Sequence, residues 1–263
     1  MNFSALMLVQ PAPISLIAVL ALGFFLGMRH ATDADHVVAV STIVSRERKL
    51  GSAALIGGLW GLGHTITILA VGAGIILFTL VIPPRLGLSM EFSVGLMLIV
   101  LGVFNLQNFK KQIGQATATE HAEPDSDSSL EHSHGAADSS VRLMDSWFGR
   151  LTIYQWVRPL VVGLVHGLAG SAAVALLVLT TLHDSHWAVA YLFIFGVGTI
   201  VGMMVITMVM ASALRYAGSR SEWINRRLAL GTGLLSVGFG IFIVYQMGFV
   251  HGLFTGHPTW TPE

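Results

Sequence analysis

The chain of 263 residues contains no cysteine. Disulfide bonds, thiolate nucleophiles and thiolate metal sites are therefore excluded. A metal could be held only by histidine, aspartate, glutamate or backbone carbonyl groups. The sequence also lacks the Gly-x4-Gly-Lys-Ser/Thr loop that cradles nucleotide phosphates, so nothing in it supports ATP hydrolysis by this chain.

Charge is scarce as well. Charged residues make up 11% of the chain and apolar residues 54%, whereas an ordinary soluble domain has about 25% charged residues. This composition excludes a soluble globule, a disordered chain and a nucleic-acid binder, because too few charges remain to solvate a surface or to neutralise phosphates. The composition predicts an all-α polytopic membrane protein whose surroundings are a lipid bilayer, with no nucleic-acid partner.

A helix needs about 20 mostly apolar residues to cross a bilayer. The sequence offers six stretches of this kind, so we predict six transmembrane helices. Twelve of the 14 Lys and Arg residues flank these stretches on one side, and basic residues mark the cytoplasmic side. We therefore expect a multi-pass protein of the cytoplasmic membrane with both termini outside. The predicted spans are 14–44, 52–82, 89–109, 156–181, 187–214 and 228–250.

The spans divide the chain into an N-terminal three-helix half (1–109), a linker (110–155) and a C-terminal three-helix half (156–263). The linker is predicted to be a flexible, acidic, histidine-containing cytoplasmic loop, because its composition cannot bury a core. The stretch Gly27–Ala31 has an echo in Gly163–Gly167. Three spans per half make the two halves enter the membrane from opposite sides, which predicts inverted repeats with a site at their interface.

The most informative stretch reads Arg-His-Ala-Thr-Asp-Ala-Asp-His from Arg29 to His36, inside the first span. On a continuous helix His30, Asp33 and His36 share an arc of about 120°, whereas Asp35 points away from it. A charged side chain at the centre of a membrane helix costs about 2.5–3.5 kcal/mol. Two imidazoles and two carboxylates suit a divalent ion such as Ni²⁺, Co²⁺ or Zn²⁺. An alternative reading pairs Arg29 with Asp33 one turn away and exposes the other polar residues to a water-filled vestibule.

Two further histidines lie inside predicted spans. His64 follows Gly61 and Gly63, where small residues allow a neighbouring helix to approach closely. It could be a ligand or a hydrogen-bonded packing residue. His166 lies in a similar glycine-rich stretch of the second half. We class it as a site or gate residue, together with three weaker candidates: Arg29, Asn105 and Ser171. An interhelical hydrogen bond is the alternative role for Asn105.

These residues resemble the nickel/cobalt transporter (NiCoT/NicO) family. The pattern His30-x4-Asp35-His36 looks like the family signature, and the segment from Leu62 to Thr65 looks like its second motif. The resemblance implies that His30, Asp33, Asp35, His36 and His64 handle the metal. The second half lacks the acidic motif of typical members and is most similar to the six-helix urease-accessory nickel permeases.

The resemblance implies a secondary permease and not an enzyme. It is expected to move Ni²⁺, with Co²⁺ as a further candidate, inward across the cytoplasmic membrane. The ion is then a substrate and not a permanently bound cofactor, and nickel-enzyme maturation proteins are possible partners. One alternative is an exporter of nickel, cobalt or a small anion, with Arg29 as the anion's partner. The other is an intramembrane metallohydrolase, although a separate general base for it is missing.

Overall fold

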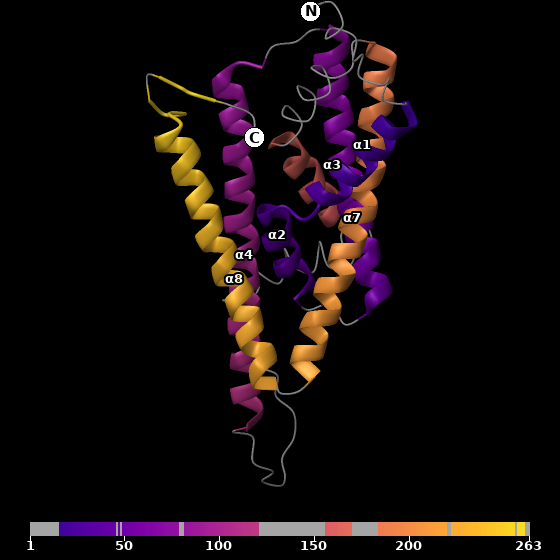
Figure 1. The fold of residues 1–263 in the computed structure, drawn as a ribbon. Helices are drawn as coiled ribbons and strands as arrows, with labels where there is room; N and C mark the ends of the chain where they lie inside the picture. The colour runs from indigo at the N-terminus through magenta and orange to yellow at the C-terminus, as the bar shows by residue number, and fades with distance from the viewer. Residues whose placement is uncertain are drawn as a thin grey trace, which may run out of the picture.

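The computed structural model describes residues 16–45, 47, 49–78, 82–120, 156–169, 184–219, 222–255 and 257–260. Regular structure in these ranges is helical, with no strand, and Figure 1 shows the helices as an elongated bundle. The helices are α1 (Leu16–His30), α2 (Ala34–Val44), α3 (Leu50–Phe78), α4 (Pro84–Glu120), an unlabelled helix Trp156–Ala169, α7 (Ser185–Ser219), α8 (Glu222–Tyr245) and the short π-helix η2 (Gln246–Val250).

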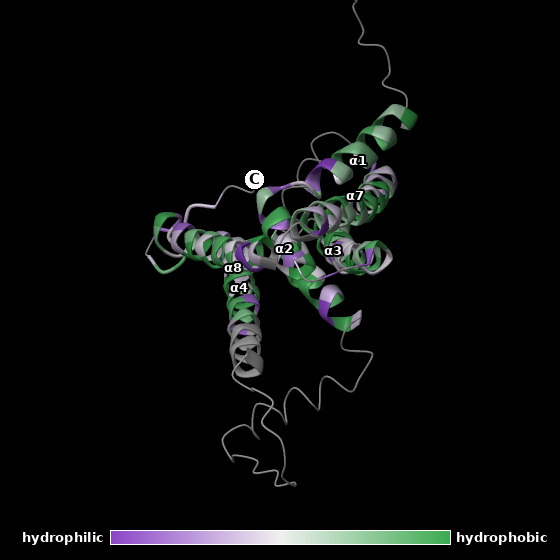
Figure 2. Ribbon diagram, turned by 90° about the horizontal axis from the view of Figure 1, so that it is seen from below, coloured by the Kyte–Doolittle hydropathy of each residue, from purple (hydrophilic) through white to green (hydrophobic). Residues whose placement is uncertain are grey.

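Within the described ranges, four helices are long and apolar enough to cross a membrane, and the bent pair of α1 and α2 makes a fifth candidate span. The chain is therefore a multi-pass membrane protein, as its composition predicts. Large apolar side chains such as Ile17, Phe25 and Phe242 face outward, and Figure 2 shows hydrophobic colour along most of the bundle. The predicted fourth span, 156–181, is described only over Trp156–Ala169, so the count of six helices stays a prediction.

The helices form two groups with α2 between them. Helix α4 packs along α8, while α7 packs against both α3 and α1. The shorter α2 contacts α4, α7 and α8, and Figures 1 and 2 both place it between the α4–α8 pair and the other helices. Helix α2, the shorter part of the bent α1–α2 pair, therefore lies in the middle of the molecule and contacts long helices on several sides.

Glycine allows α1 and α7 to cross with their backbones in contact. A Cβ atom added to Gly27 would fall on the carbonyl oxygen of Phe195, and one added to Gly198 would fall on the carbonyl oxygen of Phe24. No residue larger than glycine fits at these two crossing points without displacing a helix.

Helix α3 crosses Trp156–Ala169 in the same manner. A Cβ atom on Gly63 would fall on the carbonyl oxygen of Leu160, and one on Gly163 would fall on that of Trp60. These close crossings fix the positions of the residues that follow, including His64 and His166.

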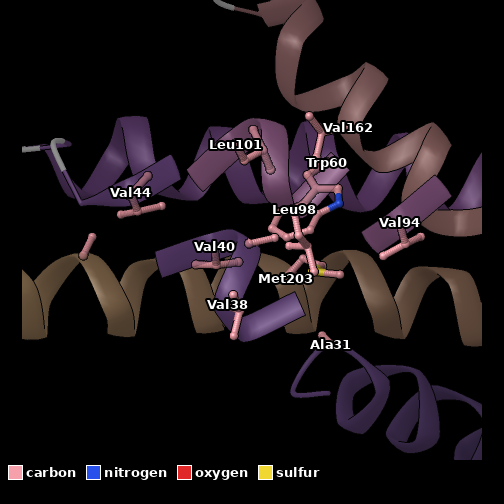
Figure 3. Close-up of a cluster of buried hydrophobic side chains, with 13 residues drawn as sticks. Ala31, Val38, Val40, Val44, Trp60, Val94, Leu98, Leu101, Val162 and Met203 are labelled. Atoms are coloured by element: carbon pink, nitrogen blue, oxygen red, sulfur yellow. The ribbon is translucent and has the colours of Figure 1, made fainter. Parts of the chain in front are cut away.

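The main hydrophobic cluster surrounds α2 and joins helices from both predicted halves (Figure 3). Trp60 of α3 and Met203 of α7 are fully buried within it. Side chains of α2, α4 and Trp156–Ala169 complete it, among them Val40, Leu98 and Val162. The core therefore holds α2 rigidly from several sides.

The predicted boundaries differ from the structure at the linker. Helix α4 runs to Glu120, so the chain is still helical over the first residues of the predicted flexible loop 110–155. The remainder of that loop, 121–155, lies outside the described residues. A polar helix can extend beyond the bilayer into water. A prediction that uses apolar length alone therefore places the end of such a helix too early in the chain.

Candidate metal centre

The predicted first span is broken between α1 and α2, and the two helices make an angle of 55°. Thr32 and Asp33 form the break. The Thr32 amide and hydroxyl both donate to the carbonyl oxygen of Arg29, at 2.8 and 2.6 Å, and close the end of α1. Asp33 then adopts an extended conformation at the N-cap of α2. Aspartate is favoured at such a position, and a second acid in the first helical turn, Asp35, suits the positive end of the helix dipole.

This break redirects Asp35. On a continuous helix Asp35 would point away from His30 and His36, but the turn at Thr32 and Asp33 redirects it into the cluster. Its Oδ1 accepts hydrogen bonds from the amide and the Nδ1 of His36, both at 2.9 Å. Its Oδ2 accepts one from Nε2 of His166 at 2.8 Å. Asp35 therefore links α2 to the helix Trp156–Ala169.

His30 ends α1 and faces α3. Its Nδ1 donates a hydrogen bond to Oδ2 of Asp33 at 2.8 Å, and its Nε2 shares a hydrogen bond with Nε2 of His64 at 3.1 Å. Two cis ligands about 2.1 Å from an octahedral ion lie about 3.0 Å apart. The spacing of these two Nε2 atoms therefore matches the spacing required of two imidazoles on one transition-metal ion.

Four imidazoles gather around this point. The ring centroids of His30, His36 and His64 lie 4.8 to 5.1 Å apart, and that of His166 lies 4.2 Å from His36. Their potential ligand atoms form two groups that share His36, each within 4.8 Å: His30, His36 and His64, and Asp35, His36 and His166. Imidazole nitrogen and carboxylate oxygen together favour a borderline divalent ion.

Three of these rings are buried and keep one nitrogen without a partner. Among the described residues, no hydrogen bond reaches Nε2 of His36, Nδ1 of His64 or Nδ1 of His166. A buried polar atom without a partner costs about 1–3 kcal/mol. Nε1 of the neighbouring Trp60 is unpartnered in the same way. The three imidazole nitrogens, unlike an indole N–H, can each bind a cation through a lone pair.

Aromatic side chains line the cluster on two sides. Trp60 stacks parallel to His36 at 6.0 Å and meets His166 edge-on at 5.6 Å. Phe195 lies 5.7 Å from His30. Sequence reasoning missed both aromatic residues, because nothing in the sequence distinguishes them from ordinary core residues.

The close approach of α3 and Trp156–Ala169 brings His64 and His166 to the site. A Cβ atom on Gly167 would lie 2.6 Å from the carbonyl oxygen of His64, and the Thr67 hydroxyl donates to the carbonyl oxygen of Leu164 at 3.0 Å. No local pattern in the sequence predicts the pairing of His166 with Asp35 across the two predicted halves.

The weaker candidates lie elsewhere. Arg29 is exposed, and Asp33 contacts His30 as described above. Asn105 donates from Nδ2 to the carbonyl oxygen of Ala229 at 3.2 Å and to the Thr232 hydroxyl at 3.1 Å, so it joins α4 to α8. Ser171 lies outside the described residues.

The comparisons with known proteins identify the relatives of this chain. It is 34% identical to the "Urease accessory protein UreH" of Bacillus sp. (strain TB-90) over 241 residues, which cover 92% of this chain and 96% of that protein. The chain belongs to the UreH family of urease accessory proteins. No family model and no solved structure matches it.

UreH is not the only kind of relative. The chain is 25% identical to two Arabidopsis thaliana proteins, "Chloroplast protein FOR GROWTH AND FERTILITY 2" and "Chloroplast protein FOR GROWTH AND FERTILITY 1", over 88% of its length. It spans only 57% and 60% of these two proteins. The match to UreH, in contrast, extends over almost the whole of both chains.

Proposed function

We propose that this member of the UreH family is a secondary permease that carries Ni²⁺ inward across the cytoplasmic membrane. The ion is the substrate, and it would bind at the cluster formed by His30, His36, His64 and His166 with the nearby acids. Co²⁺ is a second candidate substrate, because it shares the ligand preferences of Ni²⁺. The family's link to urease suggests that the nickel supplies a nickel enzyme and its maturation proteins.

One observation carries this proposal: histidine rings gather inside a membrane protein with their potential ligand atoms within 4.8 Å of one another in each of two groups, and three of these rings are buried with one nitrogen unpartnered among the described residues. Ionisable residues at lipid depth are costly and mark ion pathways in transporters. A cation at the centre would satisfy the free nitrogens, and the carboxylates of Asp33 and Asp35 would offset part of its charge. We also propose that the protein has six membrane helices with both termini outside.

Inverted repeats are a further part of the proposal, and the helix crossings support them. The sequence echo pairs Gly27 with Gly163. In the first half Gly27 faces the carbonyl oxygen of Phe195, and in the second Gly163 faces that of Trp60. If Phe195 corresponds to Trp60 in the same way, the crossing of Gly27 with Phe195 and the crossing of Gly163 with Trp60 are equivalent positions of the two repeats.

The same exchange relates the aromatic contacts of the site. His30 lies 5.7 Å from Phe195, and its counterpart His166 lies 5.6 Å from Trp60. A pseudo-two-fold relation of this kind would place the ion site at the interface of the two repeats, where transporters with inverted repeats bind their substrates.

Uptake of radioactive nickel tests the proposal. Cells that lack other nickel importers would express the wild-type protein, a His36→Ala variant or a His257→Ala variant. His257 is exposed and serves as a matched control outside the cluster. We expect uptake with the wild type and the control and background uptake with His36→Ala. Wild-type uptake by His36→Ala would refute the proposed site.

Growth on toxic nickel determines the direction of transport. An importer makes cells more sensitive to nickel, whereas an exporter protects them. Measuring cobalt accumulation in the same cells determines whether Co²⁺ is also carried.

A further inference from the structure

We propose that Asp33 and Asp35 position the imidazoles and do not themselves bind the ion. This inference rests on the proposed function of the same site. The ion would bind to ring nitrogens only. Through their hydrogen bonds, the two acids would determine which nitrogen of each ring carries the proton and which keeps the lone pair.

The hydrogen bonds of the acids select a tautomer for three rings. An ionised carboxylate only accepts hydrogen bonds, so the ring nitrogen next to it must carry the proton. Nδ1 of His30 faces Asp33, whereas Nδ1 of His36 and Nε2 of His166 face Asp35. The opposite nitrogen of each neutral ring therefore holds the lone pair that a metal needs.

The geometry of Asp35 argues against direct coordination. Its two oxygens already accept three hydrogen bonds, two from His36 and one from His166. The two nitrogens of an imidazole point to opposite sides of the ring. An ion on the free Nε2 of His36 therefore cannot also touch the carboxylate bonded to Nδ1.

Asp33 has the same relation to His30 at the edge of the cluster. Its side chain is 52% exposed, whereas that of His30 is 17% exposed. The exposed acid thus stands behind the ring on the side away from His64, whose Nε2 faces Nε2 of His30. Metal-binding histidines commonly donate their second N–H to a carboxylate in this way, and loss of that partner weakens metal affinity about 10–100-fold.

Asparagine separates a positioning role from a ligand role. At position 33 its amide oxygen can still accept the hydrogen bond from His30 Nδ1. At position 35 its amide oxygen can still accept from His36 Nδ1, whereas its NH2 group faces Nε2 of His166. The proton of His166 then moves to Nδ1, and that nitrogen loses its lone pair. Alanine removes both acceptors. A positioning acid should therefore be replaced far better by asparagine than by alanine. A ligand should be lost with either, because a neutral amide is a poor substitute for a carboxylate on a nickel or cobalt ion.

The test uses Co²⁺ titrations of the purified full-length protein, read from the visible absorption of the bound ion. We expect Asp33→Ala to weaken affinity about 10–100-fold and Asp33→Asn to remain within about tenfold of the wild type. The spectrum at saturation should be unchanged in both. Asp35→Asn should bind the ion more weakly than the wild type and more tightly than Asp35→Ala, because it restores the acceptor for His36 but not the acceptor for His166. The control is Asp184→Asn, which changes an exposed acid at the start of α7 that contacts the amide of His186.

Two outcomes would overturn this inference. Either asparagine proves no better than alanine, or the spectrum of the saturated ion changes, which shows that an oxygen ligand has been lost. If the wild-type protein binds neither Co²⁺ nor Ni²⁺, the proposed function itself is wrong. The two failures are thus distinguishable in one set of titrations.

Discussion

Replacing Gly163 by alanine should disable the site without touching any ligand. The added Cβ atom would fall on the carbonyl oxygen of Trp60 and lie 2.8 Å from its Cδ1. Nonbonded atoms prefer separations of about 3.5–4.0 Å, so the helix Trp156–Ala169 would have to retreat from α3 by roughly 1 Å.

His166 lies one turn further along that helix and would retreat with it. Its hydrogen bond to Asp35, now 2.8 Å long, would then exceed the range of about 2.7–3.2 Å for such bonds. Functional groups must be held within about 0.5 Å of their productive geometry, and an error of 1 Å can cost about 100-fold in rate. We therefore expect the initial rate of nickel uptake to fall by about two orders of magnitude.

The assay is nickel uptake normalised to the amount of protein in the membrane, with thermal unfolding as a measure of stability. Overpacking costs about 1–3 kcal/mol, which should lower the unfolding temperature and leave the protein folded. The control is Gly238→Ala on α8, where the added Cβ atom meets nothing within 4 Å. Equal uptake by Gly163→Ala and Gly238→Ala would refute the reasoning.

Three other predictions concern the histidine cluster and the packing of α4 against α8. Addition of Ni²⁺ or Co²⁺ should quench the fluorescence of Trp60, whose ring lies 6.0 Å from that of His36; Trp60→Phe should lose most of the quenching although five other tryptophans remain. Uptake should fall once the pH is low enough to protonate the imidazoles, because a protonated imidazole has no lone pair for a metal; a rate that stays constant down to the pH at which the protein unfolds would contradict imidazole coordination. Asn105→Leu should lower stability by about 1 kcal/mol through loss of two hydrogen bonds between α4 and α8, and its nickel affinity should match that of the wild type.

The sequence identifies the histidines of the site because polar residues stand out in apolar spans. His30, His36 and His64 were all proposed as ligands, and the structure brings their rings together. The helical class and the membrane character follow from composition in the same way. These properties depend on local pattern, which a single sequence displays directly.

The direction of Asp35 could not be read from a regular helical pattern. A helix-start signal was nevertheless present, because Asp33 stands where an N-cap is favoured and Asp35 follows in the first turn. The apolar runs on both sides concealed this signal, since together they resemble one continuous span. The partnership of Asp35 with His166 depends on a crossing of distant helices and has no local signal.

The break between α1 and α2 explains how the side chains of one short motif contact several helices. In a continuous helix the acids and imidazoles would spread around the axis, and each would need its own partner in the bilayer. The turn at Thr32 and Asp33 instead lets His30 end one helix while Asp35 and His36 begin another. Asp35 then lies near the positive end of the α2 dipole, which favours its ionised form. An ionised Asp35 accepts hydrogen bonds from one N–H group of His36 and one of His166. The second nitrogen of each neutral ring therefore keeps a free lone pair. The break therefore supplies the arrangement that the motif alone does not specify.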